Sequence, residues 1–120
     1  MKNGLVLEGG GMRSLFSEGV FDVLLENGIK FDGAIGVSAG ATIGSNFKSC
    51  QARRALRYNI NHSNDWRYVS LRSWITTGDI VGGEYSYHVL PFQHDIFDIA
   101  AYEANPMEFY AVCTDVDSGE

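Results

Sequence analysis

Cysteine and proline are scarce in this 120-residue chain, which has two of each. Cys50 and Cys113 are too few and too far apart in the sequence to suggest a disulfide framework or a zinc motif, so we expect free thiols and no metal site. We also expect no bound cofactor. The N-terminus also lacks an apolar run long enough for a signal peptide or a membrane span. We therefore expect a cytoplasmic protein whose contact with membranes, if it has any, is peripheral.

Positive charge is missing from the last third of the chain. Residues 77–120 contain nine acidic residues and no lysine or arginine, whereas residues 46–76 contain six basic residues and one acidic residue. A nucleic-acid-binding protein is usually basic overall, so a net charge of -6 argues against nucleic acid as a partner. The arginines and aromatic residues of 53–74 could contact phospholipid head groups, but a solvated helix face that pairs with the acidic segment is the simpler interpretation.

The order of apolar runs and glycines predicts alternating strands and helices. Apolar side chains recur at helical spacing over 12–24 and end at Gly28, a typical helix C-cap, and small residues over 39–45 favour a tightly packed helix. Residues 49–73 are typical of helix and turn. Short apolar runs predict three strands of a parallel sheet, at 5–7, 33–37 and 108–113. This βαβ order predicts an α/β fold.

A glycine-rich turn after the second predicted strand carries a serine. Residues 36–40 read Gly-Val-Ser-Ala-Gly, which matches the G-x-S-x-G nucleophile elbow. Such a turn projects the serine hydroxyl above the sheet edge, and small residues such as Gly36 and Gly40 let the backbone bend. The following helix directs its positive N-terminal end at developing negative charge. Ser38 is therefore the candidate nucleophile, and an incidental N-cap serine is the alternative.

The first predicted strand ends in a second glycine run, Gly9-Gly10-Gly11-Met12-Arg13. Glycines there leave backbone N–H groups free to bind an anion, either a phosphate or the oxyanion of an acyl-transfer intermediate. A dinucleotide fingerprint would need glycine where Ser14 stands, and no Gly-Lys-Ser or Gly-Lys-Thr of a P-loop occurs. An oxyanion site is favoured, with a non-catalytic phosphate-binding or interaction module as the alternative.

Residues 8–13 and 32–41 together resemble the opening of bacterial patatin-like phospholipases in order and spacing, and weaker similarity continues through 77–79 and 109–115. The resemblance implies a parallel-sheet α/β/α sandwich and a Ser-Asp dyad, in which an aspartate acts on the serine directly. It assigns the nucleophile to Ser38. It also implies an oxyanion hole, formed by the backbone amides of Gly10, Gly11 and Met12. The side chain of Arg13 would support this loop or bind the lipid head group.

Two positions depart from this family's pattern. Glycine usually follows the arginine, and Ser14 stands in its place. The family's aspartate lies in a D-G-G or D-G-A motif, and neither tripeptide occurs in the sequence. Asp115 and Asp117 follow a predicted strand, but Asp117-Ser118-Gly119 is typical of a turn. We therefore expect 1–120 to be the N-terminal part of a single patatin-like domain whose catalytic aspartate lies beyond residue 120.

The activity implied by the resemblance is that of a lipid acyl hydrolase, a phospholipase or esterase acting on phospholipid or another fatty acyl ester. The same acyl-enzyme could pass its acyl group to an alcohol, so an acyltransferase is the near alternative. A Ser-His-Asp triad would need His88 or His94 together with Asp65 or Asp79, and neither histidine follows a convincing strand.

Overall fold

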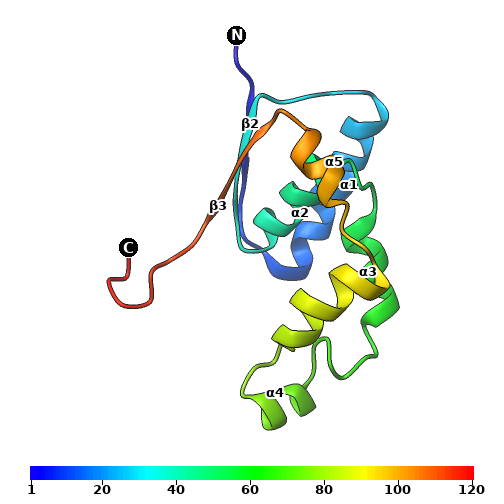
Figure 1. The fold of residues 1–120 in the computed structure, drawn as a ribbon, viewed down its shortest axis with the longest axis vertical. Coiled ribbons are helices and arrows are strands. Elements are labelled where there is room, and N and C mark those ends of the chain that lie inside the picture. Colours follow the sequence, from blue (N-terminus) through cyan, green and yellow to red (C-terminus); the bar gives the residue numbers. More distant parts are fainter. The chain divides into compact units, whose positions relative to one another are not determined.

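Three short parallel strands form one sheet in the computed structural model, which describes all residues 1–120 (Figure 1). The strands lie in the order β1-β2-β3 and comprise β1 (Gly4–Leu7), β2 (Gly33–Val37) and β3 (Glu108–Val112). Val6 lies opposite Ile35, and Ile35 lies opposite Tyr110. The predicted α/β fold class is confirmed, and the three strands lie where the apolar runs predicted them.

The chain divides into two compact units, and the sheet belongs to the first. The first unit comprises Met1–Ala55 and Asp98–Glu120, and the second comprises Leu56–Phe97. Helices of the first unit are the 3-10 helix η1 (Gly11–Ser14), α1 (Leu15–Glu26), α2 (Ala39–Lys48) and α5 (Ile99–Ala104). Figure 1 shows α1 and α2 on the same side of the sheet.

The core of the first unit lies between the sheet and these helices. Phe21 of α1 packs against Phe47 of α2 with ring centroids 5.1 Å apart, and Leu7 of β1 is buried with them. Small residues let α2 approach the sheet closely, because a Cβ at Gly44 would lie 2.7 Å from a methyl group of Leu7. The opposite sheet face, which includes Val6, is exposed.

The C-terminus of α1 shows why a glycine stands at position 28. Gly28 has a φ of +67°, a left-handed conformation that glycine adopts without steric cost. The N–H of Ile29 donates to the carbonyl of Leu24 at 2.9 Å, and the N–H of Gly28 donates to Leu25 at 3.0 Å. These bonds satisfy carbonyls that the helix itself leaves unpaired. The helix end predicted from Gly28 is confirmed.

The second unit is helical and contains most of α3 (Arg54–His62), α4 (Leu71–Thr77) and the π-helix η2 (Tyr85–His94). The hydroxyl of Ser70 caps α4 by accepting the N–H of Ser73 at 2.9 Å. Arg57 forms a two-pronged ion pair with Asp95, at 2.7 and 2.8 Å. This pair joins α3 to the end of η2 within the unit.

Candidate active site

Ser38 occupies the turn between β2 and α2, as the sequence predicted. Its side chain is exposed, and its backbone has φ 53° and ψ -124°. A positive φ is unfavourable for any residue with a Cβ and costs on the order of 1–3 kcal/mol. The turn therefore stores backbone strain at the residue that carries the candidate nucleophile.

The hydroxyl of Ser38 is not used as a helix cap. Ser38 is the N-cap residue of α2, yet its side chain accepts no hydrogen bond from the helix. The N-cap residues Ser70 and Asp98 behave differently, since each accepts an N–H from the first turn of its helix. The structure thus argues against an incidental N-cap serine and leaves the hydroxyl free at the N-terminal end of α2.

Two glycines allow the backbone to pack closely around this turn. A Cβ at Gly36 would lie 2.7 Å from the backbone N of Ala41. A Cβ at Gly40 would overlap the carbonyl oxygen of Leu7 and lie 2.6 Å from that of Glu8. These contacts are shorter than real Cβ contacts, so a side chain at Gly36 would push α2 away from β2, and one at Gly40 would push α2 away from the end of β1.

The first glycine run lies beside Ser38. A Cβ built at Gly9 would lie 3.2 Å from the Cβ of Ser38 and 3.8 Å from its Oγ. The run continues into η1, where Gly11 has a φ of +53°. Gly10, Gly11 and Met12 stand at the start of this helix, where N–H groups have no partner within the helix. The structure therefore brings an amide-rich loop next to the exposed serine.

Ser14, which stands where the family usually has glycine, is buried in η1. Its Oγ lies 2.8 Å from the position that a Cβ on Gly10 would take. The serine side chain therefore fills the space beside Gly10, so this position has no room for a side chain. The α-helix itself begins one residue later, at Leu15, after the single 3-10 turn of η1.

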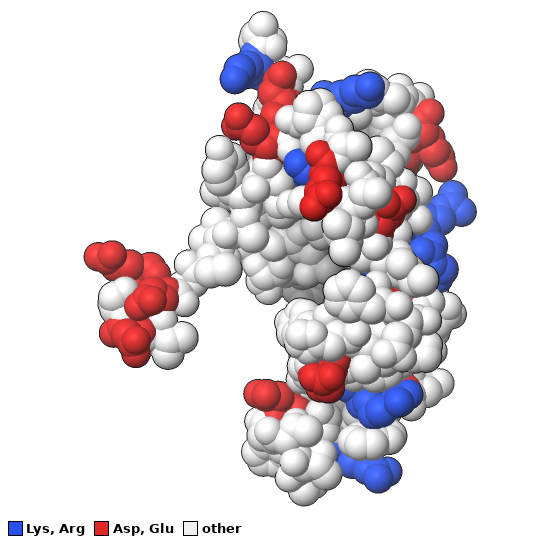
Figure 2. Space-filling view, viewed as in Figure 1, with Lys and Arg blue, Asp and Glu red and all other residues white.

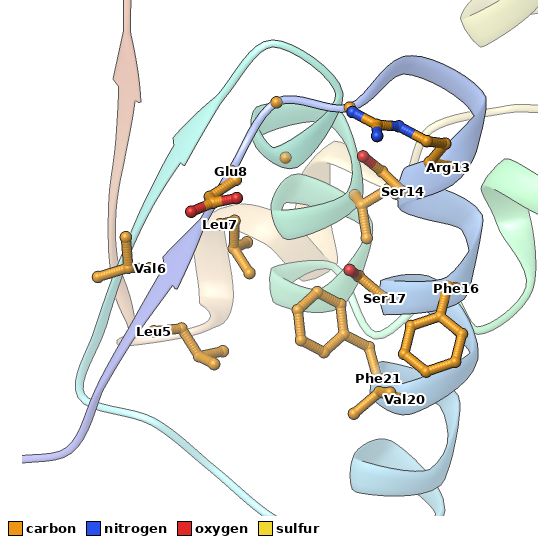
Figure 3. Close-up of a pocket in the computed structure, with 14 residues that line it drawn as sticks. Leu5, Val6, Leu7, Glu8, Arg13, Ser14, Phe16, Ser17, Val20 and Phe21 are labelled. Carbon is orange, nitrogen blue, oxygen red and sulfur yellow. The ribbon is translucent and has the colours of Figure 1, made fainter.

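A cavity of about 500 Å³ lies between β1 and α1, next to the glycine run. Figure 3 shows Leu5, Leu7 and Phe21 beside this space, with Arg13 close to the glycine end of it. Val6 points away from the space, toward the exposed face of the sheet. A cavity of this size can hold a small organic ligand. Sequence reasoning did not identify it, because the lining residues have the ordinary apolar spacing of a strand and a helix.

Arg13 lies exposed at the rim of this cavity and forms no ion pair. Its guanidinium is therefore available to an anionic group of a ligand. Other arginines of the first unit are engaged. Arg53 pairs with Glu26 at 3.5 Å and Arg54 donates to the side chain of Asn46 at 3.0 Å.

No candidate base is hydrogen-bonded to Ser38 in the structure. Asp115 accepts the N–H groups of Asp117 and Ser118 at 3.1 and 2.7 Å, so its carboxylate closes its own turn. These bonds hold the pKa of Asp115 below its usual value. Figure 2 shows acidic side chains gathered at this C-terminal turn. The residues of the alternative triad, His88, His94, Asp65 and Asp79, all belong to the second unit.

The side chains and helices were also compared with the requirements of a metal site and of a membrane span. No group of three histidine, cysteine, aspartate or glutamate residues is arranged to hold a metal ion. Cys50 and Cys113 are both exposed free thiols. None of the helices combines the length and the apolar composition that crossing a bilayer requires.

Comparison with protein families gives a match. The family described as patatin-like phospholipase matches residues 5–112, a segment that runs from β1 to β3 and includes both glycine-rich turns. No curated protein and no solved structure matches the chain. Since the family match spans most of the sequence and the parallel α/β sheet agrees with it, this chain belongs to the patatin-like phospholipase family.

Proposed function

We propose that this chain carries the nucleophile and the oxyanion-binding loop of a serine hydrolase that cleaves phospholipids or other fatty acyl esters. Membership of the patatin-like phospholipase family supports a lipid acyl hydrolase. One observation carries the finer proposal. Ser38 is exposed on a strained strand-to-helix turn, its hydroxyl caps nothing, and it lies against the glycine run.

The reaction follows from these positions. Ser38 Oγ attacks the ester carbonyl and forms the new C–O bond while a general base takes its proton. The base we propose is the aspartate of the family's Ser-Asp dyad. The carbonyl oxygen becomes an oxyanion, which the amides of Gly10, Gly11 and Met12 and the N-terminal end of α2 stabilise. Collapse expels the alcohol, which recovers the proton, and water then hydrolyses the acyl-enzyme by the same steps.

The surroundings of the glycine run suit a lipid substrate. The cavity beside it has a mixed polar and apolar lining, and its apolar part, which includes Leu5, Phe16 and Phe21, can receive an acyl chain. Arg13 stands at its rim without an acidic partner and can meet a phosphate group. Such a site would bind both the acyl chain and the anionic head group of a phospholipid. It would therefore favour a phospholipid over a simple ester, which has no anionic head group.

Covalent labelling tests the nucleophile. The full-length protein is treated with a fluorophosphonate, digested and analysed by mass spectrometry, and the adduct is expected on Ser38. An adduct confined to another serine, or no adduct, would overturn the proposal.

The non-catalytic alternative predicts saturable phosphate binding that is lost on substitution of Gly10 and unaffected by Ser38→Ala. Adding an alcohol acceptor to the reaction separates a hydrolase, which releases free acid, from an acyltransferase, which releases a new ester.

Backbone strain at Ser38 leads to a second prediction. Ser38→Gly is expected to raise the free energy of unfolding by about 1 kcal/mol, because glycine adopts a positive φ without steric cost and this relief exceeds its loss of chain entropy. Urea denaturation of the purified chain measures the change. The control is Ser45→Gly in the interior of α2, which should lower the free energy of unfolding by about 0.5 kcal/mol. Equal losses for both variants would show that the turn is not strained.

A further inference from the structure

Helix α4 of the second unit presents an apolar face to solvent. Leu71, Trp74 and Ile75 stand at i, i+3 and i+4, which places them on one side of the helix, and their exposed fractions are 72, 55 and 78%. Ser73 is the buried residue of α4, so the helix contacts its own unit through a small polar side chain. Large apolar side chains grouped in this way on a surface mark an interaction site.

The apolar face continues beyond the helix. Trp74, Ile80, Val81 and Tyr87 line an open groove of about 570 Å³. All four side chains are also exposed. We call the exposed apolar residues of this region the α4 patch, and they are Trp66, Leu71, Trp74, Ile75, Ile80, Val81 and Tyr87.

The backbone holds this patch in a defined position. Val69 and Val81 form an antiparallel bridge on either side of α4. The N–H of Ser70 donates to Ile80, and the N–H of Gly82 donates to Tyr68, both at 3.0 Å. The segments before and after α4 are therefore hydrogen-bonded to each other, and α4 lies in the closed loop between them.

Charges around the patch select the kind of partner. Arg57 pairs with Asp95, and Arg67 pairs with Asp65, whose pKa it holds well below the usual range. Arg72 has no carboxylate partner, and its guanidinium stacks on the ring of Trp66 at 4.2 Å. It is the arginine of the second unit that is left available for a phosphate.

Negative charge lies at the other end of α4. Asp79 is exposed just beyond Gly78, the C-cap of the helix, and the second unit has three arginines against four carboxylates. Figure 2 shows groups of both signs on this unit. A strongly anionic surface would not be attracted to it. A surface of zwitterionic head groups matches better, because the phosphate of one lipid can meet Arg72 and the ammonium group of a neighbouring lipid can meet Asp79 at the other end of α4.

We propose that the α4 patch docks the protein on a bilayer of zwitterionic phospholipid. Leu71, Trp74 and Ile75 enter the boundary between head groups and acyl chains, where tryptophan is favoured, and Arg72 remains with the phosphates. The surface itself is argued from the second unit alone. Its role in delivering the enzyme to lipid substrate rests on the proposed function.

Intrinsic fluorescence gives a direct test, because both tryptophans of the chain, Trp66 and Trp74, belong to the patch. The full chain is titrated with vesicles of diether phosphatidylcholine, whose ether bonds an esterase cannot cleave. We expect a blue shift of tryptophan emission and co-sedimentation that high salt does not abolish. Binding only to anionic vesicles, or no binding to either kind, would overturn the proposal.

A matched pair of variants separates the patch from general hydrophobicity. Ile75→Glu is expected to weaken vesicle binding by about tenfold or more, since it places a charge in the inserted face. Ile60→Glu makes the same change on α3, where Ile60 is 63% exposed, and should leave binding unchanged. Equal loss in both variants would overturn the proposal. Circular dichroism checks that both variants fold.

This test measures vesicle binding and not catalysis. Absence of vesicle binding would therefore leave the Ser38 labelling result intact, and absence of Ser38 labelling would leave the vesicle-binding result intact.

Discussion

Ser38→Ala is expected to lower kcat/KM for fatty acyl ester hydrolysis by about 10³-fold or more in the full-length protein. In the proposed reaction the hydroxyl forms the covalent bond to the acyl group, and alanine removes it while leaving the turn and the amides of the glycine run in place. The remaining rate would come from oxyanion stabilisation and binding alone. KM should change little, since the substituted atom acts on the reacting carbonyl rather than on the acyl chain.

Steady-state hydrolysis of a chromogenic fatty acyl ester and of a phospholipid measures this effect. Ser45→Ala is the matched control, because Ser45 lies further along α2, its hydroxyl donates to the carbonyl of Thr42, and it has no role in the proposed chemistry or substrate binding. It should retain turnover close to that of the unsubstituted protein. Comparable hydrolysis by Ser38→Ala would show that another group is the nucleophile, and a similar collapse in Ser45→Ala would point to loss of the fold.

The first unit was predictable because its residues obey strong local rules. Short apolar runs flanked by glycine define buried parallel strands, and the left-handed Gly28 ends α1 where the sequence predicted. The turn at Ser38 was predictable for the same reason, since small residues before and after it are what a close strand-to-helix turn needs. The distance between Gly9 and Ser38 follows from the topology, because neighbouring parallel strands end at the same sheet edge.

The second unit was harder to predict from sequence. Pro91 lies inside η2, although proline usually ends a helix. Wide π-type turns are rare, and no spacing of apolar residues distinguishes them. The short helix α5 was also missed, and its N-cap Asp98 is the one local signal that could have indicated it, since its side chain accepts the N–H of Ala101 at 2.9 Å. Tertiary contacts such as the Arg57–Asp95 pair stabilise these segments, and such pairings are not visible in local sequence.

The general base proposed for Ser38 could not be predicted for a similar reason. A dyad joins side chains from separate segments, so spacing around the serine says nothing about its base. Asp115 illustrates the difficulty, because it follows β3, as a catalytic acid often does, and yet its carboxylate accepts the N–H groups of its own turn. The proposed nucleophile and the proposed oxyanion loop, by contrast, are each contained in a few consecutive residues.

Gly40→Ala is expected to lower the free energy of unfolding by about 3 kcal/mol, a large share of the stability of a small domain. The new methyl group would overlap the carbonyl oxygen of Leu7 and crowd that of Glu8, and both are backbone atoms that cannot rotate away. Relief would require α2 to move off the end of β1. That movement would separate Ser38 from the glycine run, so the proposed oxyanion loop would lose its position beside the serine together with the fold.

Gly19→Ala provides the comparison that isolates this clash. Gly19 lies inside α1 with nothing within 4 Å of a built Cβ, so alanine there should raise the free energy of unfolding by about 0.5–1 kcal/mol through better helix propensity. Urea denaturation of the two variants and the unsubstituted chain measures both changes. Opposite signs are expected from the same chemical substitution. If Gly40→Ala were as stable as Gly19→Ala, α2 would not pack as closely against β1 as the structure has it. The placement of Ser38 beside Gly9 would then lose its structural basis.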